Sequence, residues 1–353
     1  MIDPQTSPSL TPEIFQARRQ QELAGVEHLG WWLESAMTPE QRLHLANDTR
    51  PFTPNGRQWA GFSETFCRVL AWYKPEVSIF RDFGWRLRPE AIERVADALR
   101  RLIDEASADP LLPAARREWL KTYDVGPLAR YTAIDDRFQT LTEQPNRTVL
   151  DFGSGIGRQA FLWSHLRSDV KLYSVDAIES LYLFQAEAYR RLFGDRLLEY
   201  FDEPAFETAV ASARGDAVVH LPTWRLTAVP DGSVDLVIAV QVLQELNEPA
   251  VRHLLGEFRR ITRSGGLLYI RDKEFWTPTH KIRVGRALLA DGWRLVFRYP
   301  GDEGTEIAGV PRLWVNAGAD TSNYFRMLAR LKRAFLPSYS RSYRSWRDLG
   351  LPI

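Results

Sequence analysis

An acid and three glycines end an apolar run in the sequence Thr148-Val-Leu-Asp-Phe-Gly-Ser-Gly-Ile-Gly157. Because glycine has no side chain, a ligand can approach the backbone N–H groups here, next to the N-terminus of a following helix. Dinucleotide-binding folds use G-x-G-x-x-G, whereas this chain has G-x-G-x-G after Asp151, an acid that would repel a pyrophosphate. The carboxylate suits a ligand that carries an ammonium group or hydroxyls. A structural turn without any ligand is the alternative.

A second acid, Asp176, ends the next apolar run in the sequence Leu172-Tyr-Ser-Val-Asp-Ala177, nineteen residues after Gly157. In nucleotide-binding α/β folds, an acid at about this spacing binds the ribose hydroxyls. The structural alternative is that Asp176 caps the helix expected from Glu179.

These motifs resemble those of the class I, Rossmann-like methyltransferases that use S-adenosylmethionine, whose first motif is an acid followed by G-x-G-x-G. The resemblance extends over roughly residues 147 to 317. It includes "PDGSVDLVIAVQVLQEL" at 230–246, which is similar to the fourth strand and its flanks, and Gly265-Gly266 before the fifth strand.

The resemblance implies S-adenosyl-L-methionine as the cofactor. Where the family often has an acid that faces the adenine amino group, this chain has Thr223, which can accept a hydrogen bond, beside Trp224, which can stack. The residues implied to bind the cofactor are Asp151, Gly153, Ser154, Gly155, Gly157, Asp176, Ala177, Thr223, Trp224 and Gln241.

The elements that must position these residues alternate between short apolar runs and helical segments. Strands are expected at 148–152, 170–175, 234–240 and 266–271, and helices from Arg158, Glu179, Glu248 and His280. This order is typical of an α/β fold with helices on both faces of a mostly parallel sheet. Two further runs, 293–299 and 311–316, predict an edge hairpin. We expect a Rossmann-like, mostly parallel seven-stranded sheet with an antiparallel edge hairpin.

The region before the sheet reads as helices. Thr11-Pro12-Glu13, Thr38-Pro39-Glu40 and Arg88-Pro89-Glu90 are helix-start patterns, and apolar residues from Ile92 to Ile103 recur at helical spacing. We expect a helical N-terminal region at 1–145, which would form a substrate cap or an oligomer contact. The methyltransferase domain follows at 146–318, and a basic amphipathic tail at 319–353.

The acceptor should lie beyond the carboxyl ends of the fourth and fifth strands, where ligands bind in such sheets. Hydrogen-bonding residues follow both strands: Gln241, Gln244 and Glu245 after one, and Arg271, Asp272, Lys273, Glu274 and His280 after the other. Such a set suits a polyhydroxylated acceptor. The long helical region, "LDFGSGIGRQ" and "GGLLYIRDKEF" resemble bacterial sugar O-methyltransferases, which implies O-methylation of a sugar or a glycosylated small molecule.

Methyl transfer to a hydroxyl needs alignment and a base. The candidates are Asp272, His280 and Glu245. Asp272 could instead form an ion pair with Lys273 or Arg271, and His280 could be a helix cap. Asp272, Glu274 and His280 could together hold a metal ion, although no metal ligand is assigned.

Composition limits the partners and the compartment. The net charge is +1, so the whole chain gives no electrostatic argument for nucleic acid. The asparagine-proline-proline-aromatic signature of DNA amino-group methylases is also absent, and no DNA partner is expected. One cysteine excludes an intrachain disulfide, and no apolar run predicts a signal peptide or a transmembrane span. We expect a cytoplasmic protein.

Two features leave alternatives open. The tail at 319–353 has an amphipathic basic segment that could contact an anionic surface, bind a phosphate-bearing substrate, or simply remain solvated. The competing functions are methylation of another small molecule, a protein or RNA, and a non-catalytic S-adenosylmethionine-binding partner subunit. Homo-oligomerisation is also open.

Overall fold

Eight strands of the described residues form one sheet in the order β3-β4-β2-β1-β5-β6-β8-β7. The computed structural model describes residues 10–23, 59–72, 89–139, 147–166, 169–246, 248–272, 284–298 and 309–317. The strands are β1 (Thr148–Phe152), β2 (Lys171–Asp176), β3 (Leu197–Glu199), β4 (Val218–Pro222), β5 (Val234–Val240), β6 (Thr262–Asp272), β7 (Trp293–Arg298) and β8 (Val310–Asn316).

The sheet is parallel from β3 through β6, and β8 and β7 pair antiparallel at the other edge. This confirms the expected α/β class, the mostly parallel sheet and the antiparallel edge. The strand number is eight where seven were expected, because the three residues of β3 pair with β4. So short a strand leaves no alternating pattern in the sequence.

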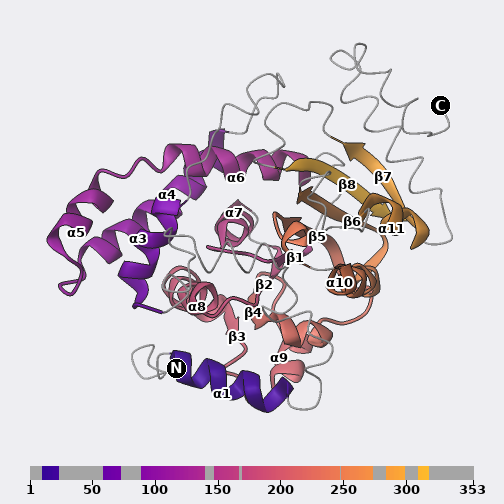
Figure 1. The fold of residues 1–353 in the computed structure, drawn as a ribbon, viewed down its shortest axis with the longest axis horizontal. Coiled ribbons are helices and arrows are strands. Elements are labelled where there is room, and N and C mark those ends of the chain that lie inside the picture. The colour runs from indigo at the N-terminus through magenta and orange to yellow at the C-terminus, as the bar shows by residue number, and fades with distance from the viewer. Residues whose placement is uncertain are drawn as a thin grey trace, which may run out of the picture.

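Helices cover both faces of the sheet (Figure 1). They are α1 (Pro12–Leu23), α3 (Phe62–Trp72), α4 (Pro89–Ser107), α5 (Ala114–Lys121), α6 (Gly126–Gln139), α7 (Arg158–Leu166), α8 (Glu179–Phe193), α9 (Phe206–Ser212), α10 (Glu248–Ile261) and α11 (Val284–Ala290). The expected helix starts at Pro12, Pro89, Arg158, Glu179 and Glu248 are confirmed. None of the described helices is long and apolar enough to cross a membrane.

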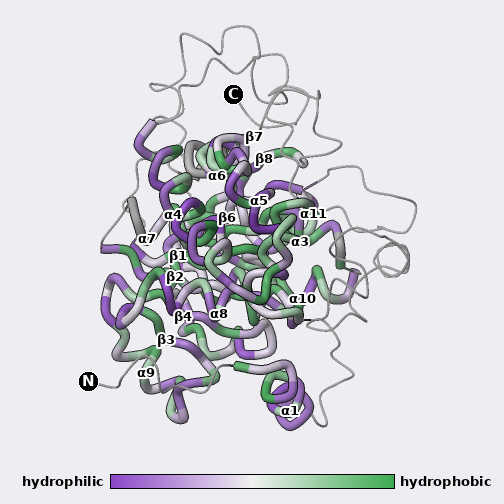
Figure 2. Tube along the Cα trace, turned by 90° about the vertical axis from the view of Figure 1, so that its left-hand side faces the viewer, coloured by the Kyte–Doolittle hydropathy of each residue, from purple (hydrophilic) through white to green (hydrophobic). Residues whose placement is uncertain are grey.

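The two faces have separate hydrophobic clusters. One joins α3, α4, α6 and α7 to strand residues such as Val149, Ile238 and Tyr269. The other joins α1, α9 and α10 to residues such as Leu150 and Val237. The N-terminal helices therefore share a continuous core with the sheet. Figures 1 and 2 place α1, largely hydrophilic in colour, at the end of the molecule opposite to β7 and β8.

A row of polar residues crosses the face that α6, α7 and α8 cover. Cross-strand pairing places Glu199 beside His220, His220 beside Ser174, and Ser174 beside Asp151. One strand further, Ile238 separates Asp151 from Tyr269. We call Glu199, His220, Ser174, Asp151 and Tyr269 the polar row. All five are buried, so each polar group needs a partner in the protein or in a ligand.

Candidate functional site

The glycine loop follows β1 and has the backbone conformation that favours glycine. The φ angles are +70° at Gly153, +59° at Gly155 and +77° at Gly157. A side chain in this left-handed region is strained. The N–H of Gly153 donates to the carbonyl of Val175 over 2.8 Å, which joins the loop to β2. The loop is therefore a tight turn at the carboxyl ends of the two central strands.

Two of the three glycines are also required by packing within the protein. A Cβ at Gly153 would collide with the side chain of Val242, and one at Gly157 would lie 2.5 Å from the hydroxyl of Tyr189. The absence of side chains at these positions therefore has a structural cause. It does not by itself indicate a ligand.

Asp151 provides an observation that does indicate a ligand. Its carboxylate is buried, and its Oδ2 has no hydrogen-bond partner among the described residues. Burial raises its pKa to about 8, partly opposed by the charge of Arg158 and reinforced by Asp176 and Asp135. An unpartnered buried carboxylate oxygen is costly unless a bound group satisfies it. An ammonium group beside the glycine loop would do so.

Asp176 lies at the end of β2, against the glycine loop, as expected. Its Oδ2 accepts hydrogen bonds from the N–H of Gly155 at 2.9 Å and from Nε2 of Gln185 at 3.2 Å. Its Oδ1 accepts from the N–H groups of Ala177 and Ile178 at 2.8 and 2.9 Å. Burial raises its pKa, and these four donors oppose the rise. The carboxylate of Asp176 thus joins the glycine loop to the segment that follows β2. All four of these hydrogen bonds come from the protein itself.

Thr223 and Trp224 begin the 3-10 helix η5 (Thr223–Ala228), directly after β4. Pro222 pairs with Asp176, so Thr223 lies near the end of β2. The Oγ1 of Thr223 is buried without a partner in the described part of the chain. Trp224 instead donates its indole N–H to Glu22 of α1 over 3.0 Å, and packs edge-on against Phe15. Sequence reasoning did not foresee that α1 reaches this residue.

Gln241 has an unusual backbone at the end of β5. Its φ is +57°, and it is the one non-glycine residue with positive φ that the described ranges contain. Its N–H donates to the carbonyl of Arg271 at 2.9 Å, and its side-chain oxygen accepts from the hydroxyl of Tyr131 at 3.3 Å. Strained backbone of this kind clusters at functional sites. The conformation turns the chain away from β5 beside the glycine loop.

Asp272 ends β6 with its side chain buried. Its Oδ2 accepts from the N–H of Leu243, in the turn η6 (Leu243–Glu245), and its Oδ1 has no partner within the described residues. Burial raises its pKa to about 6, while the charge of Arg312 lowers it. The expected candidate base is therefore near the carboxyl end of β5, with one free oxygen.

Arg271 does not face an acceptor, contrary to expectation, because it is fully buried in an ion pair with Asp135 of α6. Its Nε and Nη2 donate to the two oxygens of Asp135 at 2.7 and 2.9 Å, and Tyr269 donates to the same carboxylate. The guanidinium groups of Arg271 and Arg158 both lie over the ring of Tyr131. A buried arginine needs a counter-ion. The signal for this in the sequence was an arginine that directly follows the apolar run of β6, "LLYIR".

Other expected residues lie outside what the structure describes. Those are His280, Lys273, Glu274 and the side chain of Glu245. Within the described ranges, no three His, Cys, Asp or Glu side chains are grouped to hold a metal ion.

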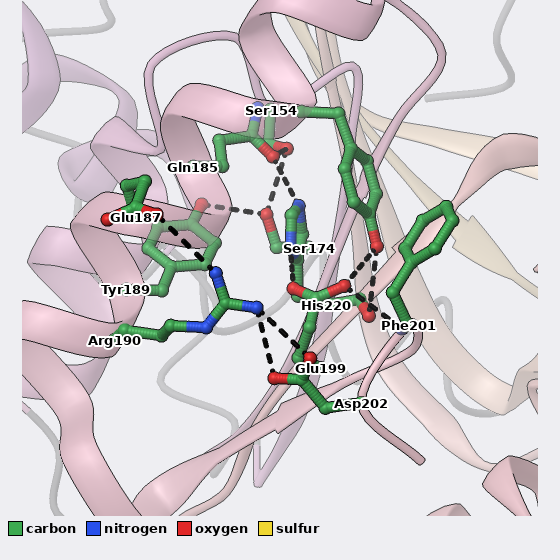
Figure 3. A network of polar contacts seen from close by, with 11 residues as sticks. Ser154, Ser174, Gln185, Glu187, Tyr189, Arg190, Glu199, Phe201, Asp202 and His220 are labelled. Atoms are coloured by element: carbon green, nitrogen blue, oxygen red, sulfur yellow. Dashed lines mark hydrogen bonds and ion pairs between the residues drawn. The ribbon is translucent and has the colours of Figure 1, made fainter. Parts of the chain in front are cut away.

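A buried hydrogen-bond network that includes Gln185 adjoins the loop and was not predicted (Figure 3). His220 lies 2.6 Å from Glu199 and 2.8 Å from Gln185. Ser154 donates to Gln185 at 3.2 Å. The signal in the sequence was a histidine inside the apolar run of β4, "VVHLP". A histidine that only packs in the core would give the same sequence pattern.

Comparison with known proteins gives one family match, at residues 150–270, to a protein-family model described as a methyltransferase domain. The matched segment runs from β1 to β6 and contains every residue expected to bind the cofactor. A search of curated proteins finds no match.

Similar solved structures include a SAM-dependent methyltransferase from Aquifex aeolicus. It is 19% identical, with a TM-score of 0.34, and the match covers 55% of this chain and 98% of that one. Another is 1,6-didemethyltoxoflavin-N1-methyltransferase from Burkholderia thailandensis, solved with S-adenosylhomocysteine. It is 16% identical, with a TM-score of 0.35 and coverage of 64% and 89%.

Proposed function

We propose that this chain, a methyltransferase that uses S-adenosylmethionine, methylates a hydroxyl group of a small, polar, sugar-containing acceptor. The observation that supports a hydroxyl acceptor is the Oδ1 of Asp272, which has no partner among the described residues. Asp272 ends β6 at the same edge of the sheet at which Gln241 follows β5. A carboxylate oxygen can accept a hydrogen bond but cannot donate one. A sugar hydroxyl, which donates, would satisfy it.

The cofactor supplies an electrophilic methyl group on a sulfonium. In the proposed site, the Oδ2 of Asp151 accepts a hydrogen bond from the ammonium group of the cofactor. The Oγ1 of Thr223 accepts one from the adenine amino group, in the place where the methyltransferases that this chain resembles often have an acid. Trp224 would need to leave Glu22 to stack on the adenine, so we keep it only as a neighbour of that group. Ser154, Gly155 and Gln241 complete the wall of the site.

Asp176 is proposed to bind the ribose hydroxyls. Its four hydrogen bonds from the protein occupy the acceptor capacity of a carboxylate. A ribose hydroxyl therefore binds there only in exchange for one of these donors. We propose that Gly155 and Ala177 shift when the cofactor enters.

Alignment and proton removal are the tasks left for the protein. Asp272 is the proposed base. Its pKa, raised to about 6, makes it a stronger base than an ordinary aspartate and still leaves it largely ionised near neutral pH, so that it can take the hydroxyl proton. His280 and Glu245 remain alternative bases. The N-terminal region, 1–145, is proposed as a cap over the acceptor, since Tyr131 of α6 binds Gln241. The tail, 319–353, is proposed to contact an anionic surface, and the protein is proposed to be cytoplasmic.

The test begins with mass spectrometry of ligand that co-purifies with the protein. A screen with isotope-labelled S-adenosylmethionine and a panel of nucleotide sugars follows. Label in the ether-linked methyl group of a sugar is the expected result. Label only in protein, RNA or a sugar-free compound would overturn the acceptor proposal, and bound cofactor with no transfer to any class would favour a non-catalytic subunit.

A further inference from the structure

Gln185 of α8 connects the two cofactor loops through one side-chain amide. Its Nε2 donates to the carbonyl oxygen of Gly155 and to Oδ2 of Asp176. Its Oε1 accepts from the hydroxyl of Ser154 and faces Nε2 of His220. The side chain is completely buried. One amide thus contacts the glycine loop twice and the end of β2 once.

The orientation of this amide follows from its partners. A carbonyl oxygen and a carboxylate oxygen can only accept, so the atom that faces Gly155 and Asp176 must be the nitrogen. The oxygen then faces His220, and Nε2 of His220 must carry a proton to donate to it. Asp176 and Gly155 therefore fix the protonation of one nitrogen of a histidine two strands away from the glycine loop.

Glu199 satisfies the other nitrogen of His220. The Nδ1 of His220 lies 2.6 Å from Oε2 of Glu199, and the hydroxyl of Tyr182 donates to Oε1 at 2.7 Å. Burial raises the pKa of Glu199, but the charge of His220 and the hydrogen bonds from His220 and Tyr182 outweigh this and lower it. Arg190, which is paired with Asp202 and Glu187, adds a positive charge nearby (Figure 3). His220 is therefore held between the amide of Gln185 and the carboxylate of Glu199.

Stability alone does not account for this pair. Burying an ionisable histidine and a carboxylate costs desolvation energy, and apolar side chains of similar volume are often as stable or more stable. The pair instead makes one arrangement of hydrogen bonds much better than any other, and that arrangement ends at Gly155 and Asp176. The three residues of β3 have a clear role in it, because β3 places Glu199 beside His220.

We infer that Gln185, with His220 and Glu199 behind it, is a positioning residue that holds Gly155 and Asp176 in the arrangement required for cofactor binding. The inference rests on the proposed function, because it takes these two residues as part of the cofactor site. His220 and Glu199 act through Gln185, and Gln185 acts through Gly155 and Asp176.

The first experiment measures the affinity for S-adenosylhomocysteine by calorimetry in Gln185→Leu and Gln185→Glu, alongside thermal unfolding. Gln185→Leu removes every hydrogen bond, and Gln185→Glu keeps the shape but places a carboxylate against Asp176. Because each variant disturbs a hydrogen bond to the charged Asp176, we expect each to bind S-adenosylhomocysteine at least about tenfold more weakly. Leu183→Ala is the control. Leu183 is buried on the same helix, α8, but belongs to the hydrophobic cluster that contains α1, α9 and α10. It should lower the unfolding temperature and leave affinity within about threefold.

Affinity within about threefold of wild type in both Gln185 variants would overturn the inference. So would an equal loss in Leu183→Ala, because the effect would then follow stability alone. Asp176→Ala separates this inference from the proposed function. If it binds like wild type, the cofactor site lies elsewhere and both fail, whereas loss in Asp176→Ala with normal Gln185 variants rejects the inference only.

A second pair of variants decides the question if the Gln185 variants do not fold. In Glu199→Gln, the amide nitrogen can donate to the Nδ1 of a neutral His220 and the amide oxygen can accept from Tyr182, whereas Glu199→Leu can form neither hydrogen bond. We expect Glu199→Gln to bind S-adenosylhomocysteine at least about fivefold more tightly than Glu199→Leu. Equal affinities in the two variants would overturn the inference.

Discussion

The carboxylate of Asp272 accepts a hydrogen bond from the backbone N–H of Leu243 over 3.2 Å. This bond ties the end of β6 to the turn that follows β5, next to the strained backbone of Gln241. It uses Oδ2 and leaves Oδ1 without a partner among the described residues. One side chain therefore both fixes the turn and offers a free acceptor.

We predict that Asp272→Asn lowers the single-turnover rate of methyl transfer by about a hundredfold or more, the low end of the effect of a general base. Asparagine keeps an oxygen for Leu243, so the turn should survive, and S-adenosylhomocysteine affinity should stay within about threefold. In the wild type, the rate should rise with pH through about 6 as Asp272 ionises. A rate close to wild type in Asp272→Asn would move the base to Glu245 or His280.

Asp151 should make the folded protein less stable as the pH rises. Its folded pKa is about 8 against an ordinary value of 3.8, so the folded state holds a proton that the unfolded state has lost. The stabilisation from this proton is complete below about pH 4 and disappears as the pH rises through about 8. Arg158, Asp176 and Asp135 are the charges that act on the group.

Urea unfolding of wild type and Asp151→Asn at about pH 5 and about pH 9 checks this. The wild type should lose on the order of a few kcal/mol relative to the variant between the two conditions. The same substitution should weaken S-adenosylhomocysteine binding, because the amide cannot neutralise the ligand ammonium. Parallel stability curves for the two proteins would show that Asp151 ionises normally.

Gly155→Val should abolish binding of S-adenosylhomocysteine more completely than it lowers the unfolding temperature. Its φ of +59° strains any side chain, and a β-branched one most. Gly194→Val is the matched control, since Gly194 has a φ of +52° and nothing within 4 Å of an added Cβ. Gly194→Val should lose about as much stability as Gly155→Val and should still bind S-adenosylhomocysteine. Retained binding in Gly155→Val would identify the loop as a structural turn.

Arg271→Met should cost about 3 to 5 kcal/mol of unfolding free energy, because the buried Asp135 loses its two-point contact with Arg271 and keeps the more distant Arg158, at 3.5 Å. Adding Asp135→Leu should not restore the loss, because the buried Arg158 then loses its ion pair with Asp135. Arg252→Met, which removes an exposed pair with Glu248, should change stability by less than about 1 kcal/mol. Denaturant titration measures all three, and a loss in Arg271→Met no larger than that in Arg252→Met would contradict the prediction.

The local part of this structure was predictable from the sequence. Apolar runs located β1 and β5 to the residue, and proline with a following acid located the starts of α1 and α4. Local signals also located Asp151 and Asp176, because each acid directly follows buried strand residues. The count of strands was one too low, since the three residues of β3 carry no periodic pattern.

The contacts between distant segments were not predictable in the same way. Arg271 was expected to face an acceptor, because nothing in its neighbourhood reveals that Asp135 lies beside it in space. Trp224 was expected to be free for adenine, and the helix that takes its indole N–H begins more than two hundred residues earlier. His220 and Gln185 were passed over because each looks like an ordinary core residue until the partners are known.

The pairing of Asp135 with Arg271, 136 residues apart, has a consequence for how the chain is made. Helices α3, α4 and α6 leave the ribosome well before the strands that their apolar faces cover, and α1 precedes its partner Trp224 by 202 residues. Until β6 emerges, Asp135 has Arg158 of α7 as a counter-ion but not Arg271, and the sheet lacks β6, β7 and β8. Contacts of such long range form slowly and leave apolar surface open to aggregation. A ribosome stalled before residue 262 would therefore hold a nascent chain whose first half cannot complete its fold.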